Sequence, residues 1–260
     1  MICKQCGNEI DDDAQFCEKC GRNTGRAAAE QNPFAAPAHA STGLTPIENA
    51  DLRASARRQL KGVWGKMAAA IFVYAVLFYP GMLLFYDYSP AFYNPFHNAA
   101  LYMFFYIALL VTSGAFSLGF AGFCLKRIRG EEIAVKNIFD GFKRFLPSFL
   151  LMFFFYLFTF LWGLLLVIPG IIKLLGYYMA FYIMYDNPGI KPLEALKRSQ
   201  DMMKGHKGKL FRLHLSFLGW FFLGALTLGI GFFWILPYFY LSLSNFYETL
   251  KQKHENAAGY

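Results

Sequence analysis

The chain has 260 residues, of which 56% are hydrophobic and only 16% are charged. Soluble domains carry about a quarter charged residues, so this composition excludes a protein covered by water on all sides. The formal net charge of +8 would suit nucleic acid, but the basic residues lie at the ends of apolar segments rather than in one stripe, and we expect no nucleic-acid partner.

The chain begins with two Cys-x-x-Cys pairs, Cys3 with Cys6 and Cys17 with Cys20, each followed by glycine. Four thiolates around Zn²⁺ form a closed tetrahedral site, which stabilises a fold without catalysing a reaction. About twenty residues cannot otherwise bury a sufficient core. We therefore predict a zinc ribbon over residues 1–22 in a reducing compartment, with a disulfide pair or a redox dithiol as the alternatives.

This segment resembles the zinc-ribbon family found at the N-termini of many prokaryotic membrane proteins. The resemblance is carried by Cys-Lys-Gln-Cys-Gly at 3–7, the acidic stretch at 11–14 and Phe-Cys-Glu-Lys-Cys-Gly at 16–21. It implies zinc but no particular partner. The acidic stretch occupies the place of a signal-peptide apolar region, so we expect the first spanning helix to direct insertion.

Residues 23–44 are Ala-rich with scattered Pro, Asn, Ser and Thr, which predicts a flexible linker. We expect a basic juxtamembrane amphipathic helix over residues 45–66. Thr45 can cap it, Pro46 fits the first helical position, and Glu48 can reach back as in a capping box.

Six apolar blocks follow, and they predict an all-α polytopic membrane protein with a six-helix transmembrane domain over residues 67–250. The blocks are 67–86, 99–125, 145–168, 171–185, 210–228 and 230–246. The fourth and sixth are short for full spans. The sequences Pro-Gly at 169–170 and Gly-Ile-Gly at 229–231 are either external turns or breaks within longer helices.

Basic residues precede the first block, follow the second, precede the fifth and follow the sixth, whereas residues 87–98 contain no Lys or Arg. The positive-inside rule then places the N-terminus and the tail, 251–260, in the cytoplasm of a cell whose inner membrane the chain crosses. Lys173 is the exception to this pattern.

An internal repeat is suggested by the motif Lys-Gly-x-x-Gly-Lys, which occurs at 61–66 and at 204–209 directly before apolar blocks. A second alignment, offset by 61 residues, pairs Asp140, Lys143, Gly163, Gly170 and Tyr177 with Asp201, Lys204, Gly224, Gly231 and Tyr238. The unit is a basic interfacial helix followed by a helical hairpin. The alternative is that these matches arise by chance, because glycine and lysine are common where any membrane helix enters the interface.

An interfacial amphipathic helix is expected near residues 192–205, because apolar and basic residues fall on different sides at helical spacing. Its basic residues would meet anionic lipid headgroups, or would simply form a solvated connector that obeys the positive-inside rule.

Several short segments are distinctive: Asp-Asn-Pro at 186–188, Glu-Ala-Leu-Lys-Arg-Ser at 194–199, Met-Lys-Gly-His at 203–206, Lys-Leu-Phe at 209–211 and Ile-Pro-Gly-Ile-Ile at 168–172. Through these segments the chain resembles the DUF975 family of bacterial membrane proteins over about residues 53–251. The family is uncharacterised, so the resemblance implies a six-span inner-membrane protein and no catalytic or binding residues.

Three single residues are predicted to have structural rather than functional roles. Lys173 is expected to reach the outer headgroups, His214 to be a helix-entry residue, and Cys124 to be a small buried hydrophobe. The polar residues within the blocks are expected to join helices rather than bind ions. They are Thr112, Ser113, Thr159, Ser216, Ser242, Ser244 and Asn245.

The sequence contains no catalytic triad, no His-Glu-x-x-His and no phosphate-binding glycine loop, so we predict no enzymatic activity. Our main hypothesis is a membrane scaffold or adaptor whose ribbon recruits a cytoplasmic protein. The alternative is a transporter or lipid-handling protein with an accessory ribbon, which predicts a polar cavity between the helices.

Overall fold

The computed structural model describes residues 48–78 and 95–257. Every regular element in these ranges is helical, and no strand occurs in them. The elements are α2 (Asn49–Leu60), α3 (Trp64–Phe78), α5 (Pro95–Ile128), η2 (Val135–Arg144), α6 (Phe145–Leu165), α7 (Val167–Tyr177), α8 (Ala180–Asp186), α9 (Pro192–Met202), α10 (Lys207–Leu226) and α11 (Phe232–Ala257). The predicted ribbon and linker and the capping residues Thr45 and Pro46 lie outside the described residues.

Four described segments are long and apolar enough to cross a membrane, and each of the six predicted apolar blocks overlaps at least one described helix. The four segments are Tyr106–Ile128, Val135–Leu165, Val167–Asp186 and Lys207–Leu226. α3 is apolar but shorter than these segments. α11 has an apolar first half and a charged second half, and it continues through most of the predicted tail. The predicted fold class, an all-helical polytopic membrane protein, is confirmed.

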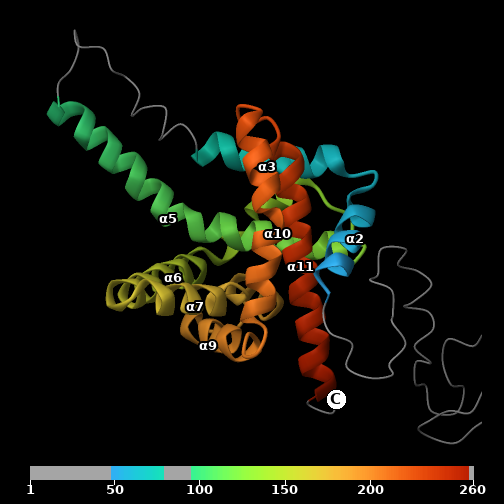
Figure 1. The fold of residues 1–260 in the computed structure, drawn as a ribbon. Coiled ribbons are helices and arrows are strands. Elements are labelled where there is room, and N and C mark those ends of the chain that lie inside the picture. The colour runs from blue at the N-terminus through green and yellow to red at the C-terminus, as the bar shows by residue number, and fades with distance from the viewer. Residues whose placement is uncertain (1–47, 79–94, 258–260) are drawn as a thin grey trace, which may run out of the picture.

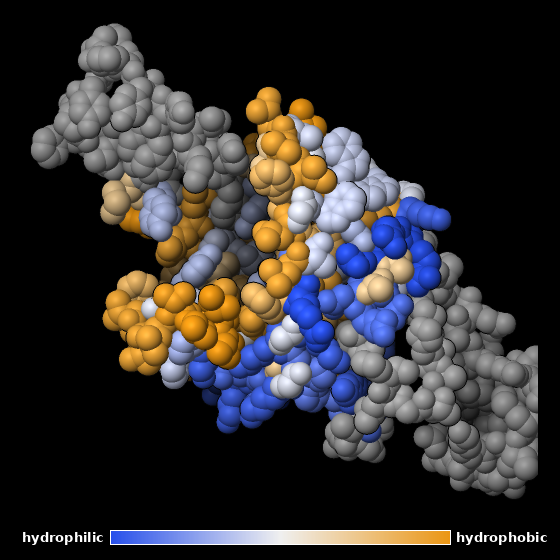
Figure 2. All heavy atoms as spheres, viewed as in Figure 1, coloured by the Kyte–Doolittle hydropathy of each residue, from blue (hydrophilic) through white to orange (hydrophobic). Residues whose placement is uncertain are grey.

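The molecule has a polar end and an apolar end. Hydrophobic side chains gather over α6, α7 and α10, whereas hydrophilic ones gather over α9 and α2 (Figure 2). Phe160 and Leu164 on α6 are 67% and 75% exposed, and Leu228 after α10 is 95% exposed. Such surfaces are stable in hydrocarbon, where apolar side chains need no cover.

The helices spread from the polar end. α10 and α11 lie side by side, α6 and α7 form a second pair, and α5 leads away diagonally (Figure 1). α9 packs against α6, α7 and α8. Ser199 on α9 is fully buried, donates a hydrogen bond to Gly176 O at 2.7 Å, and accepts one from Met179 N at 3.1 Å. This side chain satisfies backbone groups where the fourth apolar block breaks between α7 and α8.

The two expected interfacial helices end earlier than predicted, in turns of the same form. α2 ends at Leu60 and α9 at Met202, because Gly62 and Gly205 adopt positive φ of 77° and 74°. In each turn the residue after this glycine donates its N–H to the carbonyl three residues earlier. The two Lys-Gly-x-x-Gly-Lys motifs therefore share one backbone conformation.

The hairpins α6–α7 and α10–α11 also share a close contact between glycines. A Cβ added to Gly170 would lie 2.9 Å from Gly163 Cα, and a Cβ added to Gly231 would lie 2.9 Å from Gly224 Cα. These are the glycine pairs that the sequence aligns at the 61-residue offset. The aligned ion pairs, Asp140–Lys143 and Asp201–Lys204, also form, at 2.8 and 2.7 Å. The shared geometry supports internal duplication.

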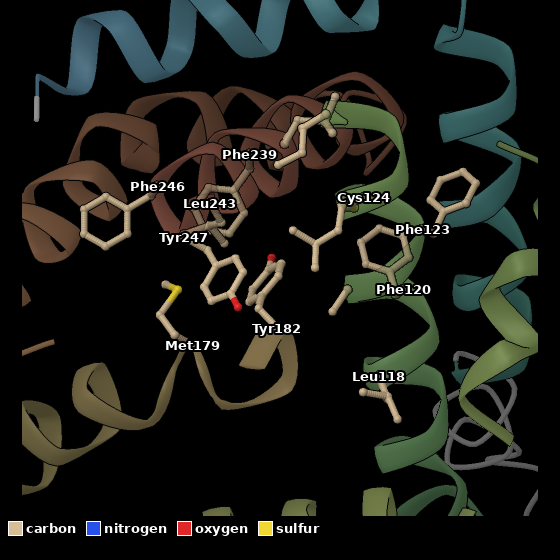
Figure 3. Packing of buried hydrophobic residues seen from close by; sticks show 14 of the residues in the cluster. Leu118, Phe120, Phe123, Cys124, Met179, Tyr182, Phe239, Leu243, Phe246 and Tyr247 are labelled. Atoms are coloured by element: carbon tan, nitrogen blue, oxygen red, sulfur yellow. The ribbon is translucent and has the colours of Figure 1, made fainter. Parts of the chain in front are cut away.

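The core lies where α2, α5, α8 and α11 meet. Gln59 of α2 and Asn245 of α11 exchange two buried side-chain hydrogen bonds of 2.9 and 2.8 Å. Tyr182 and Tyr247 stack at 5.3 Å between their ring centres and lie close to Met179 (Figure 3). These contacts join the first and last described helices to the centre of the fold.

Candidate ligand-binding cavity

The predicted zinc ligands Cys3, Cys6, Cys17 and Cys20 lie outside the described residues, so the zinc site stays a prediction. Within residues 48–78 and 95–257, no group of three or more His, Cys, Asp or Glu side chains is arranged to hold a metal ion.

A cavity of about 280 Å³ lies where α3, α5, α6, α8 and α11 converge. Its lining residues are mostly aromatic, and five tyrosines and one serine among them carry hydroxyl groups. The lining residues are Ile71, Tyr74, Ser117, Phe120, Ala121, Met152, Phe155, Tyr156, Tyr178, Phe181, Tyr182, Leu236 and Tyr240. We call this space the tyrosine cavity. No Asp, Glu, Lys or Arg is among these described lining residues, so the site offers hydrogen bonds and apolar contact but no ionic partner.

The rings of the cavity are held by other rings behind or beside them. Phe120 meets Tyr240 edge to face at 4.7 Å between centroids, which links α5 to α11. Tyr178 meets His214 of α10 at 5.1 Å in the same manner. Edge-to-face contacts fix ring orientation as well as burying area, so this wall is largely pre-formed.

A second, larger space of about 760 Å³ lies between α5 and α6. It is lined by Tyr106, Leu109, Leu110, Ser113, Phe149, Met152, Phe153, Tyr156, Leu157, Thr159 and Phe160. We call it the apolar groove. Met152 and Tyr156 line both spaces, so these two side chains form the partition between groove and cavity. Phe153 and Phe160 are 46% and 67% exposed, which places the groove on a lipid-facing surface.

A closed group of charges joins three helices at the polar end. Asp186, at the end of α8, accepts two hydrogen bonds of 2.8 Å from Arg129 and one of 2.8 Å from Lys251. Tyr247 donates a fourth at 3.0 Å, and Arg129 also reaches Glu248 at 2.9 Å. We call these five residues the Asp186 cluster. Two positive and two negative charges balance there, so the cluster is suited to holding α5, α8 and α11 together.

Burial lowers the pKa of Arg129, but the bonds to Asp186 and Glu248 outweigh burial and raise that pKa above its usual value. The guanidinium therefore stays charged. Sequence reasoning missed this cluster because the residues that bond to each other are separated by 57 to 119 positions in the chain.

The structure supports two of the three single-residue interpretations. Cys124 is fully buried in the core (Figure 3). His214 Nδ1 is hydrogen-bonded to Leu210 O at 2.9 Å, and its ring lies between Tyr178 and Phe239. The Lys173 ammonium lies 4.7 Å from the centre of the Trp162 ring and interacts electrostatically with Lys207 at the start of α10. Its expected reach to the outer headgroups stays a prediction.

The polar residues of the apolar blocks mostly bond within their own helices. Thr112, Ser113, Ser216 and Ser242 donate to carbonyls three or four residues earlier. Such a bond satisfies a hydroxyl group in an apolar helix, so that it needs no partner on a neighbouring helix. Within this set of seven residues, Ser244, 3.4 Å from Tyr182 Oη, and Asn245, bonded to Gln59, are the members that bond to another described helix. The expectation that this set joins helices is wrong for most of its members.

Comparison with known families agrees with the architecture. The zinc-ribbon domain family matches residues 2–23. The family described as protein of unknown function (DUF975) matches residues 47–175 and 163–254, and the two matches together cover most of the chain and all of its described helices up to α11. Searches among curated proteins and among solved structures found no match. The chain thus belongs to the DUF975 family and carries a zinc-ribbon domain before the family's helical region.

Proposed function

We propose that this protein is a non-enzymatic lipid-handling protein of the bacterial inner membrane, which holds an amphiphile between its helices. The observation that carries the proposal is the tyrosine cavity beside the apolar groove. An amphiphile needs an apolar surface for its chain and hydrogen-bonding groups for its polar part, and the two spaces supply these next to each other.

Several features support this assignment. The groove opens on a surface rich in exposed apolar side chains, so a lipid chain can enter it without crossing water. The cavity is lined by hydroxyls and aromatic rings and by no charged residue, which favours a neutral polar group. Tyr156, which is 53% exposed, forms part of the partition and is placed to admit a ligand by changing rotamer.

The test is native mass spectrometry of the full-length protein released from bacterial membranes, with identification of the co-purifying amphiphiles. Ala121→Phe places a ring inside the cavity and should abolish retention of the bound species. Leu218→Phe, on an exposed face of α10, adds the same ring elsewhere and should leave retention unchanged. The proposal fails if the wild type carries no amphiphile beyond the lipid annulus, or if Ala121→Phe retains it fully.

The proposed orientation puts both termini and the basic segments in the cytoplasm, with α2 and α9 facing anionic headgroups. It is supported by the gathering of hydrophilic residues over those helices, and by His254 near the end of α11, whose Nε2 lies 3.3 Å from Met202 O of α9. In intact cells a membrane-impermeant thiol reagent should label Leu228→Cys and leave Lys253→Cys unlabelled. The reverse result would invert the topology.

A second candidate is an adaptor that recruits a cytoplasmic protein through its ribbon. The specific observation favouring it is the zinc-ribbon match at residues 2–23, since a closed structural zinc site serves to present a surface. In-cell crosslinking and co-purification should compare the full chain with one that begins at Thr45. Partners lost with the ribbon would support the adaptor, and an unchanged partner set would leave the helical region as the functional part.

A further inference from the structure

Two half-buried lysines from distant segments, Lys173 and Lys207, interact electrostatically with each other. Lys173 on α7 and Lys207 at the start of α10 are both half-buried, and neither forms an ion pair within the part of the chain that the structure describes. Their neighbour Lys204, by contrast, pairs with Asp201 at 2.7 Å.

Both side chains are held in defined places. Lys207 lies against Gly176 of α7, where an added Cβ would come within 3.3 Å of Lys207 Cε and 3.4 Å of its Nζ. The side chain of Gln200 on α9 borders the same glycine. Lys173 Nζ lies 4.7 Å from the centre of the Trp162 ring on α6. α7 thus contacts α6, α9 and α10 in the region where the two lysines lie. Figure 1 shows how these four helices are arranged.

The two charges are close enough to disfavour each other. The ammonium of Lys207 loses solvation through burial and is repelled by those of Lys173 and Lys204. A half-buried cation beside apolar surface is unfavourable unless an anion compensates it. Polar residues at membrane depth that lack a protein partner commonly mark a ligand position.

We propose that Lys173 and Lys207 bind a phosphate group, as carried by a lipid headgroup or by a soluble phosphate. The proposal concerns a site separate from the tyrosine cavity and does not depend on the proposed function. Ile171 and Ile172, beside Lys173, are 43% and 47% exposed, so an acyl chain attached to the phosphate would find an apolar surface next to the site. A lipid is for this reason the favoured source.

The test compares Lys173→Met and Lys207→Met with Lys209→Met, which removes the same charge two residues along α10. Full-length protein in phosphatidylcholine nanodiscs containing phosphatidylglycerol is analysed by native mass spectrometry for retained anionic lipid. The first two variants should each lose more than the roughly fivefold that a lysine contributes merely by lying near an anionic surface, because each also removes a direct contact with the phosphate. Lys209→Met should lose clearly less.

A second arm identifies the source of the phosphate. Inorganic phosphate is titrated into detergent-solubilised protein while thermal unfolding is followed. Stabilisation of the wild type but not of Lys207→Met would assign a soluble phosphate, whereas selective retention of phosphatidylglycerol alone would assign the lipid. Lys173→Arg keeps the charge and the contact with Trp162, so it should retain binding and separate loss of charge from misfolding.

The proposal is overturned if neither probe distinguishes the Lys173 and Lys207 variants from Lys209→Met. Equal losses in all three would mean that only the general basic surface attracts anions. If Lys173→Arg, which keeps the positive charge, also lost binding, the proposal of a charge-based phosphate site would be contradicted.

Discussion

At the scale of single residues, Asp186 is the side chain on which the polar end most depends. Its carboxylate is 6% exposed and accepts bonds from Arg129, Lys251 and Tyr247, so removing its charge leaves two cations without their main partner. Breaking a buried pair costs about 3–5 kcal/mol, because the remaining charge stays desolvated. We predict that Asp186→Asn strongly lowers the thermal unfolding temperature of the detergent-solubilised protein.

The matched control is Asp201→Asn, which removes a carboxylate from the exposed Lys204 pair. Exposed ion pairs contribute little to stability, so this variant should unfold with the wild type. Equal behaviour of the two variants would show that the Asp186 cluster does not hold the helices together.

His206, in the turn between α9 and α10, predicts a pH dependence. Burial lowers its pKa below the usual 6.5, with further lowering by Lys253, Lys209 and His254. The unfolded chain then binds a proton that the folded chain does not, so stability is complete above pH 6.5 and falls as pH drops below it. The aligned position in the first repeat is valine. His206→Val should therefore reduce the difference in unfolding temperature between pH 7.5 and pH 5, and an unchanged difference would contradict this.

At the scale of elements, the hairpin α6–α7 depends on the close contact of Gly170 with the backbone of Gly163. Gly170 is buried, and any added side chain meets main-chain atoms that cannot move aside. We predict that Gly170→Leu destabilises the protein by about 1–3 kcal/mol, as overpacking does. A Cβ on exposed Gly163 meets nothing within 4 Å, so Gly163→Ala should be tolerated. Denaturation in detergent distinguishes them, and equal tolerance would exclude the tight crossing.

The two Lys-Gly-x-x-Gly-Lys motifs share a turn conformation but differ at one position that matters for the proposed phosphate site. The turns at Gly62 and Gly205 match, but the position occupied by Trp64 in the first motif is Lys207 in the second. The phosphate site therefore belongs to one unit and has no counterpart lysine in the first motif. The shared backbone is the feature that duplication would explain, and the lysine is a difference between the two motifs.

At the scale of the whole molecule, the ribbon and the helical region are predicted to be independent units joined by a flexible linker. We expect Cys17→Ser to abolish bound zinc, measured by metal analysis of the purified protein, because a tetrahedral site lacking one thiolate binds far more weakly. Membrane insertion and the thermal unfolding of the helices should not change. Full zinc occupancy in this variant would rule out the four-cysteine site.

The helices spread from a polar end that is held by charges and amides, and they expose apolar side chains toward the other end. The stability of the polar end comes from the Asp186 cluster and the Gln59–Asn245 pair, whereas the spread leaves room for the cavity and the groove. The spread of the helices from the polar end therefore leaves the space in which the candidate site lies.

The sequence by itself determined the fold class and the approximate helices, because hydropathy and glycine placement act locally along the chain. It also suggested the repeat unit, whose turns and glycine contacts share their geometry. It also predicted the zinc ligands from their spacing alone. Helix ends were less well predicted, since positive φ at Gly62 and Gly205 ended α2 and α9 early. Whether a polar residue such as Ser242 bonds its own helix or a neighbour depends on packing that local pattern does not record.

Only the tertiary structure decided which residues from distant segments meet. The tyrosine cavity draws on α3, α5, α6, α8 and α11, and no local spacing relates its side chains. The Asp186 cluster and the approach of Lys173 to Lys207 arise in the same way. Hydrophobicity specifies that a segment enters the membrane, but it is non-directional, so the angles at which helices cross, and hence the spaces between them, follow from side-chain packing and buried polar contacts.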